Sequence, residues 1–391
     1  MLKNLLISCG FRYDALNLNY NESRSMQVES VETNTDQNKN QTPKSSPDER
    51  KSDRRDLSPV IKIIPKTCYE KSYLQGVGLF VRDVVIYIAL LAVAASTDTW
   101  YILIPVYVLL MMNLVGLFII GHDAAHGSLT ASNKLNDLIA NLAMLPGLHM
   151  SEIWKYGHNR IHHGRTVNQV FDFIWHPYTA EQYNQMNSFQ KLRHKFEWGP
   201  LGSGMYYLRE IWWNRTILFK PPKSIETKVR LSKLMLTAVF IIGSYFSAKH
   251  GLETYGTMAG ALWMWIKLVA LPFYLVNHAI AWAVYVHHIS PEITWHRRKE
   301  WDPFKGQVQG TTIFRVSKIA NFFLHNIFEH VPHHVDARIP CYHLIEASDA
   351  IVKHFPEDAQ VEKLNWNKFK RFNEACKLYD FDNHCWQSYP I

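Results

Sequence analysis

Long apolar stretches constrain the fold of this chain more than any other feature of its sequence. Residues 79–120 are mostly apolar, with Arg82 and Asp83 near the start, and are broken near 96–99 by Ser, Thr and Asp. At 1.5 Å per helical residue, each half is about as long as the hydrocarbon core of a bilayer is thick, so the stretch predicts a helical hairpin. Two later stretches predict a second pair of spans. The four predicted transmembrane helices cover 79–97, 100–120, 234–248 and 260–286.

The basic residues around these spans predict how the chain is oriented. Lys and Arg precede the first and third predicted spans and follow the second and fourth, whereas the two opposite loops hold almost none. The positive-inside rule then places both termini in the cytoplasm. The formal charge of +8 is spread over these flanks and forms no single stripe, so it does not indicate nucleic-acid binding. We expect an integral protein of a bacterial inner membrane or of the endoplasmic reticulum.

The polar ends of the chain differ from the apolar middle. Residues 1–60 are rich in Asn, Ser, Asp and Lys and cannot bury enough apolar surface to offset chain entropy, so we expect a disordered tail. The membrane domain then covers 61–355, and 356–391 form a cytosolic C-terminal tail. The five cysteines include no CxxC pair, which argues against a disulfide framework and fits a reducing compartment.

Three histidine clusters lie just outside the predicted spans, and the predicted topology puts all of them on the cytoplasmic side. They read HDAAH at 122–126, HNRIHH at 158–163 and HVPHH at 330–334. Residues four apart on an α-helix share a face, so we expect each of the first two clusters to aim two imidazoles at one point. These predicted pairs are His122 with His126, and His158 with His162.

The number of imidazoles indicates the kind of metal site. The three clusters hold eight, more than one four-coordinate zinc needs and enough for two iron ions. The HExxH motif typical of zinc hydrolases is absent, as are the Glu-x-x-His pairs of soluble di-iron proteins. A metal transporter would place its histidines within the spans or in a low-complexity loop. We therefore predict a two-iron site built from histidine.

The clusters and their flanks resemble the histidine boxes of the membrane fatty acid desaturases. Trp154-Lys155-Tyr156 precedes the second box, Glu300-Trp301-Asp302 precedes the third, and Ile339-Pro340-Cys341-Tyr342-His343 follows it. These segments are most similar to the acyl-lipid desaturases of plants and cyanobacteria that turn oleoyl into linoleoyl chains or act further along. The resemblance covers roughly residues 75–355.

The resemblance implies an all-α integral membrane fold, in which four transmembrane helices carry a cytosolic helical cap that holds a histidine-rich di-iron site. The implied reaction uses O2 and two electrons to introduce a cis double bond into the acyl chain of a membrane lipid. No flavin motif and no fused cytochrome b5 motif is present, so a separate ferredoxin or cytochrome b5 is the implied electron donor. Related di-iron membrane oxygenases, namely carotenoid ketolases or hydroxylases and fatty acid hydroxylases, share such boxes and stay open as alternatives.

The resemblance also implies roles for individual residues. One ligand outside the boxes is expected directly after the last span, at His288, with His287 as its alternative, while Ser290 stands where the family has a further histidine. The implied metal ligands are His122, His126, His158, His162, His163, His288, His330, His333 and His334. The residues expected to support these ligands through hydrogen bonds are Asp123, Asp172, His325 and Asn326, with Asp302 as a further carboxylate.

Overall fold

The computed structural model describes residues 54–390. The expected disordered tail at 1–60 therefore lies, up to residue 53, outside the described residues. Its described end includes the start of the short helix α5 (Ser58–Ile63), in which Val60 is buried.

Four helices in the described part of the chain are long and apolar enough to cross a membrane, the number that the sequence predicts. They are α6 (Tyr73–Ser96), α7 (Trp100–His126), α14 (Lys223–Tyr255) and a continuous helix at Met258–His288. The last consists of α15 (Met258–Trp265), the π-helical turn η5 (Ile266–Ala270) and α16 (Leu271–His288). Each helix extends past its predicted span at one end or at both. The longest extension is that of α14, since the Lys- and Glu-containing segments on either side of its apolar run continue a helix well.

The long helices leave apolar side chains uncovered. Val85 and Ile88 on α6, and Ile241, Ile242 and Phe246 on α14, are all exposed. Exposed apolar side chains along helices of this length are unfavourable in water and favourable in the hydrocarbon core of a lipid bilayer. The chain is accordingly a membrane protein.

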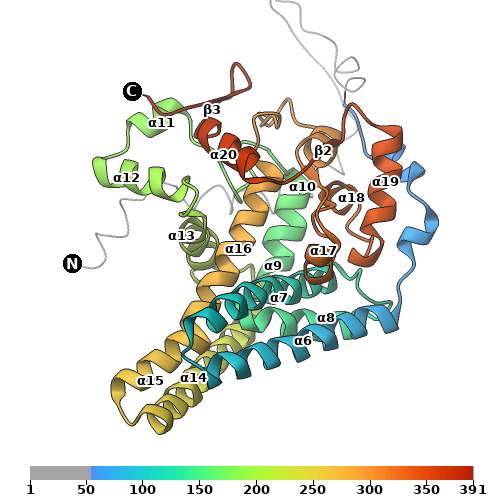
Figure 1. Cartoon of the computed structure of the whole chain (residues 1–391). Helices are drawn as coiled ribbons and strands as arrows, with labels where there is room; N and C mark the ends of the chain where they lie inside the picture. The colour runs from blue at the N-terminus through green and yellow to red at the C-terminus, as the bar shows by residue number, and fades with distance from the viewer. Residues whose placement is uncertain (1–53, 391) are drawn as a thin grey trace, which may run out of the picture. The chain divides into compact units, whose positions relative to one another are not determined.

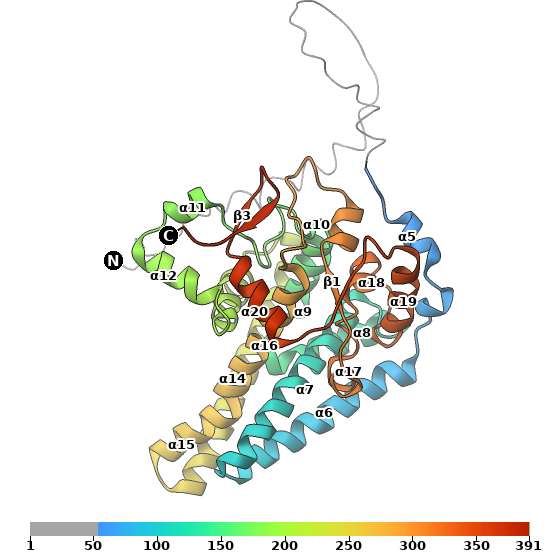
Figure 2. The same ribbon diagram turned by 45° about the horizontal axis from the view of Figure 1, so that its top comes forward.

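The long helices form two hairpins that meet at their turns. Figures 1 and 2 show α6 beside α7, and α14 beside α15. Asp98, in the turn of the first hairpin, accepts hydrogen bonds from Lys267 Nζ at 2.9 Å, Trp263 Nε1 at 2.7 Å and the Tyr255 hydroxyl at 2.7 Å. Lys267 is fully buried within η5. Because both turns lie at this end, the final turns of α7 and α16, which carry histidines, lie at the other.

Shorter elements fill the two remaining parts of the chain. Those between α5 and α14 are η1 (Lys66–Tyr69), α8 (Asn133–Met144), η2 (Leu145–Gly147), α9 (Ser151–Trp154), η3 (Lys155–His162), α10 (His163–Arg165), α11 (Ala180–Asn184), α12 (Ser188–Glu197), α13 (Ser203–Tyr206) and η4 (Tyr207–Ile217). Those after α16 are η6 (Lys305–Gln309), β1 (Thr312–Phe314), α17 (Lys318–Leu324), α18 (His330–Val335), η7 (Cys341–His343), α19 (Leu344–His354), β2 (Gln360–Glu362), α20 (Trp366–Ala375), β3 (Leu378–Asp380) and β4 (Cys385–Gln387).

The segment after residue 355, which the sequence sets apart as a tail, packs against the rest of the described chain. Strand β2 pairs in parallel with β1, while β3 and β4 form an antiparallel hairpin. Helix α20 buries Phe369 and Phe372, and the Tyr379 hydroxyl accepts a hydrogen bond from the Trp295 backbone N–H at 2.9 Å. These contacts hold the C-terminal segment on the elements that follow α16.

Candidate metal centre

The three histidine boxes converge at the end of the long helices opposite their turns. The first box occupies the last turn of α7, which Gly127 ends in the left-handed conformation with φ +73°. The second box lies on η3 and α10, and the third forms α18. Segments more than 150 residues apart in the chain therefore supply one centre, in which the ring nitrogens form two groups.

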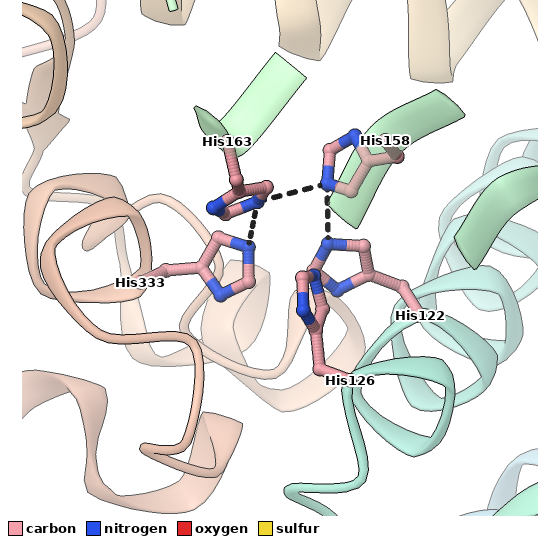
Figure 3. Close-up of side chains that lie close together, drawn as sticks. All are labelled: His122, His126, His158, His163 and His333. Atoms are coloured by element: carbon pink, nitrogen blue, oxygen red, sulfur yellow. Dashed lines mark hydrogen bonds between the residues drawn. The ribbon is translucent and has the colours of Figure 1, made fainter. Parts of the chain in front are cut away.

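The first group joins all three boxes (Figure 3). One nitrogen from each of His122, His126, His158, His163 and His333 lies within 4.8 Å of the others. Four Nε2 atoms form a row, with 2.9 Å from His122 to His158, 3.1 Å from His158 to His163 and 3.1 Å from His163 to His333. Several imidazoles thus point their nitrogens at one small volume.

The second group joins the second and third boxes to the end of α16. It consists of His162, His288 and His334, again with ring nitrogens within 4.8 Å of one another. His288 Nδ1 donates to the Gly310 carbonyl oxygen at 3.0 Å, which leaves its Nε2 for the group. His330 lies beside the group, with its Nε2 3.1 Å from the Nε2 of His334.

The second box is divided between the two groups because its helix is not an α-helix. In the π-helix η3, backbone hydrogen bonds join residues five apart, so residues five apart share a face. His158 consequently shares the first group with His163, while His162 turns toward the second group. The α-helical spacing predicts His158 with His162, and this pairing differs from the one in the structure. The predicted pairing of His122 with His126 holds on the α-helix α7.

The nitrogens of these groups suit metal ions. Burial lowers the pKa of His158, His163, His333 and His334 well below the usual value, and the charges of neighbouring histidines lower it further. These rings are therefore neutral at pH 7, and each then carries one lone pair that no N–H occupies. In the row of Nε2 atoms, three short contacts bring such lone pairs close together. A single cation can be coordinated by several of these lone pairs at the same time. An all-nitrogen donor set suits iron, zinc, copper or nickel.

Two buried carboxylates orient one histidine in each group. His122 Nδ1 donates to Asp123 Oδ1 at 3.1 Å, and His162 Nδ1 donates to Asp172 Oδ1 at 3.0 Å. Burial raises the pKa of Asp172, but the interactions with His162, His288 and the Val167 N–H together outweigh burial, and the net shift of the pKa is downward. Because the proton sits on Nδ1 in both histidines, Nε2 is free to face the group. This is the geometry that the sequence predicts for these two acids.

The other predicted supporting residues act at a distance from the two groups. His325 Nε2 lies 2.6 Å from Asp83 Oδ2, on the buried side of α6. The Asn326 side chain donates to the Cys341 carbonyl oxygen at 3.1 Å. Asp302 accepts a backbone N–H at the start of η6. His325 and Asn326 thus fix the segment that leads into the third box, and within residues 54–390 none of the three is hydrogen-bonded to a histidine of the groups.

Several residues that the motifs do not indicate support the centre. His334 Nδ1 donates to Gln307 Oε1 at 2.9 Å and lies 3.2 Å from Thr166 Oγ1, while Trp301 Nε1 donates to the Thr166 carbonyl oxygen at 2.8 Å. No spacing rule points to Gln307. Asp83 had a signal in the sequence, because a charged residue inside an apolar span is expensive unless it has a partner.

His287 and Trp154 stack on the centre from outside the two groups. The His287 ring stacks on His330 with 4.1 Å between ring centroids. Trp154 stacks on His158 at 4.5 Å and meets Phe118 edge-on at 4.8 Å. Of the two adjacent histidines at the end of α16, the structure thus brings His288 into a group and leaves His287 beside it.

Long membrane helices that end in a largely buried, all-imidazole cluster define a membrane protein with a candidate metal centre. Comparisons with known proteins specify the family. The fatty acid desaturase family matches residues 98–363. The chain belongs to this family, and the resemblance drawn from its histidine boxes is confirmed.

Individual relatives are similar over most of their length. The chain is 30% identical to the sn-1 oleoyl-lipid 12-desaturase of a Picosynechococcus species, over 84% of this chain and 91% of the relative. It is 27% identical to the chloroplastic omega-6 fatty acid desaturase of Arabidopsis thaliana, over 83% of this chain and 69% of the relative. It is 31% identical to the sn-1 acyl-lipid omega-3 desaturase (ferredoxin) of a Synechocystis species, over 75% of this chain and 80% of the relative.

Proposed function

We propose that this protein is an O2-dependent acyl-lipid desaturase, delta-12-like, that introduces a cis double bond into the acyl chain of a membrane lipid. The observation that carries the proposal is the convergence of three histidine boxes into two buried groups at the end of membrane helices, in a chain of the fatty acid desaturase family. The names of its relatives, which include an oleoyl-lipid 12-desaturase and an omega-6 desaturase, support this substrate class.

The two groups are the proposed holders of two iron ions. When bound, the irons supply the oxygen-activating redox chemistry that hydrogen removal from an unactivated methylene requires. The first iron would be held by His122, His126, His158, His163 and His333. The second would be held by His162, His288 and His334, with His330, which lies beside His334, as the ninth ligand.

Protein side chains have three tasks in this proposal. Asp123 and Asp172 keep a proton on Nδ1 of their histidines and so present Nε2 to the metal. Trp154 and Phe118 form an aromatic wall beside His158, which keeps water from the reacting acyl chain. Because an acyl chain offers no polar group near the reacting carbons, its position must come from such apolar contacts.

The proposal includes an orientation and an electron donor. The basic residues that flank the long helices favour a cytosolic active site beneath a cytosolic helical cap, with both termini cytosolic, in a bacterial inner membrane or the endoplasmic reticulum. The electrons come from a separate ferredoxin or cytochrome b5. The word ferredoxin in the name of the Synechocystis relative supports the first of these donors.

Expression in a host whose lipids are monounsaturated tests the activity. Profiling of fatty acid methyl esters should show a new diene with the wild-type chain. His162→Ala should abolish it and lower the iron content, because His162 lies in the second group, whereas His354→Ala changes an exposed histidine outside both groups and should keep the diene. A hydroxylated fatty acid in place of the diene, or an oxygenated carotenoid in a carotene-making host, would contradict the proposal.

A further inference from the structure

A third set of metal-ligating side chains lies outside the two histidine groups. It consists of His296 and Glu300, on the segment that follows α16, and His384, in the turn between β3 and β4. One nitrogen or oxygen from each lies within 4.8 Å of the others. The proposed desaturase reaction does not use any of these residues.

His296 is the most buried member of the set. The residue is only 8% exposed, and a nitrogen of its ring lies within 4.8 Å of a Glu300 oxygen and a His384 nitrogen. Its backbone is held firmly, because its N–H donates to the Val167 carbonyl oxygen at 3.0 Å and its own carbonyl oxygen accepts from Gln169 N–H at 2.9 Å.

His384 is oriented in the way that metal-binding histidines usually are. Its Nδ1 donates to the Trp295 carbonyl oxygen at 3.3 Å, which turns its Nε2 toward Glu300 Oε2, 3.6 Å away. A backbone carbonyl that holds the distal N–H is a recurring feature around metal ligands, because it sets both the tautomer and the ring orientation. The residue has φ +51°, so the turn keeps a strained backbone at this position.

Glu300 is the third side chain and is held from its own side. The Arg297 backbone N–H donates to Glu300 Oε2 at 3.0 Å. The guanidinium of Arg297 is paired with Asp382, and the Lys305 ammonium donates to the Glu300 backbone carbonyl oxygen at 2.9 Å. These contacts fix the position of the Glu300 side chain, whose Oε2 also lies 3.6 Å from His384 Nε2.

We propose that His296, Glu300 and His384 bind one structural Zn²⁺ ion, separate from the proposed di-iron centre. Zinc takes histidine nitrogens and carboxylate oxygens at about 2.0–2.2 Å, which separates tetrahedral ligand atoms by roughly 3.3 Å. The 3.6 Å between His384 Nε2 and Glu300 Oε2 is already near this separation, and a His296 nitrogen lies within 4.8 Å of both atoms. Water completes the coordination at the exposed side.

The zinc joins two segments that are distant in the sequence. His384 belongs to the β3–β4 hairpin, whereas the backbone of His296 is bonded to Val167 and Gln169, in the loop that carries Asp172. A metal at this place therefore fastens the C-terminal hairpin beside the loop that supports His162. Its expected effect is on stability, while the iron content stays the same.

Metal analysis of the iron-loaded, full-length protein tests this inference. The protein is purified without a histidine tag, incubated with micromolar ZnSO4 and desalted. Mass spectrometry of the metals should find one zinc per chain beside the iron. Glu300→Gln and His384→Asn should each lose the zinc and keep the iron, while His354→Asn, the same change at an exposed histidine outside the clusters, should keep both.

Thermal unfolding supplies a second readout. Zinc should raise the unfolding midpoint of the wild-type protein and of His354→Asn by several degrees, but not that of Glu300→Gln or His384→Asn, since a ligand stabilises only the folded form that binds it. The inference is overturned if the wild-type protein keeps no zinc, if both variants keep as much zinc as the wild type, or if the third metal is iron.

Discussion

Replacing Asp172 by Asn changes one carboxylate oxygen into an amide and leaves the shape of the side chain nearly the same. Asp172 is buried, and both of its oxygens are in use. Oδ1 accepts from His162 Nδ1 at 3.0 Å and from Ile174 N–H at 3.2 Å, while Oδ2 accepts from Val167 N–H at 2.8 Å. An Asn side chain has only one oxygen, so its NH2 must face either the backbone donor Val167 or the histidine.

The size of the effect follows from that conflict. If the NH2 faces Val167, a buried backbone donor loses its acceptor, at a cost of about 1–3 kcal/mol. If it faces His162, the imidazole must accept at Nδ1 and carry its proton on Nε2, the atom that faces the second group. Loss of a hydrogen-bond partner behind a metal ligand typically lowers metal affinity by about 10–100-fold, or roughly 1.4–2.7 kcal/mol.

Iron release against a competing chelator measures this effect. Asp172→Asn should release one iron at a chelator concentration about 10–100-fold lower than the wild-type protein does, because only the second group contains His162. The control is Asp349→Asn, an exposed carboxylate paired with Arg315. Iron release by Asp172→Asn at the wild-type chelator concentration, together with a wild-type unfolding midpoint, would refute the argument, because each orientation of the amide gives up either the His162 or the Val167 hydrogen bond.

Three further predictions concern packing and the polar contacts of the long helices. Gly116→Ala should lower the free energy of unfolding by about 1–3 kcal/mol, seen as a lower unfolding midpoint, because its Cβ would lie 2.3 Å from the Phe323 carbonyl oxygen. Gly78→Ala, which has open space around its Cβ, should leave the midpoint unchanged. Asp83→Ala should destabilise the protein by about 3–5 kcal/mol in chemical unfolding, because it leaves the buried His325 without its partner. Hydrogen bonds, above all that from Lys267, lower the pKa of Asp98 from 3.8 to about 2. The charged Asp98 side chain therefore contributes its full stabilisation above pH 3.8 and loses it as the pH falls toward 2. Asp98→Asn should remove this step from the pH dependence of the unfolding midpoint.

The local sequence pattern was sufficient to predict those features of this protein that depend on residues close together in the chain. The four long helices were predictable from the apolar runs, because a long apolar segment in lipid can pair all its backbone N–H and C=O groups by forming a helix, independently of the rest of the chain. The roles of Asp123 and Asp172 as acceptors for histidine were also predictable, because each acid lies close in sequence to the box that it supports. Asp302, expected as a further supporting carboxylate, instead accepts the Lys305 N–H at the start of η6.

The division of the histidines between the two groups was not predictable in this way. An α-helical spacing pairs His158 with His162, and only the π-helical turn of η3 pairs His158 with His163. The choice of His288 over His287 depends on the Gly310 carbonyl oxygen, which comes from a distant loop. Likewise, Asp83 meets His325 only because α17 packs on α6 and α7.

The sequence by itself determined that the chain crosses a membrane and that it carries three imidazole boxes of the desaturase type, because hydropathy and motif spacing are properties of neighbouring residues. Only the tertiary structure decided which nitrogens meet, and it also brought His384 to His296 and Glu300. The physical reason is that a metal ligand is defined by the direction of a lone pair in space. Packing between distant segments sets that direction, and no local pattern encodes it.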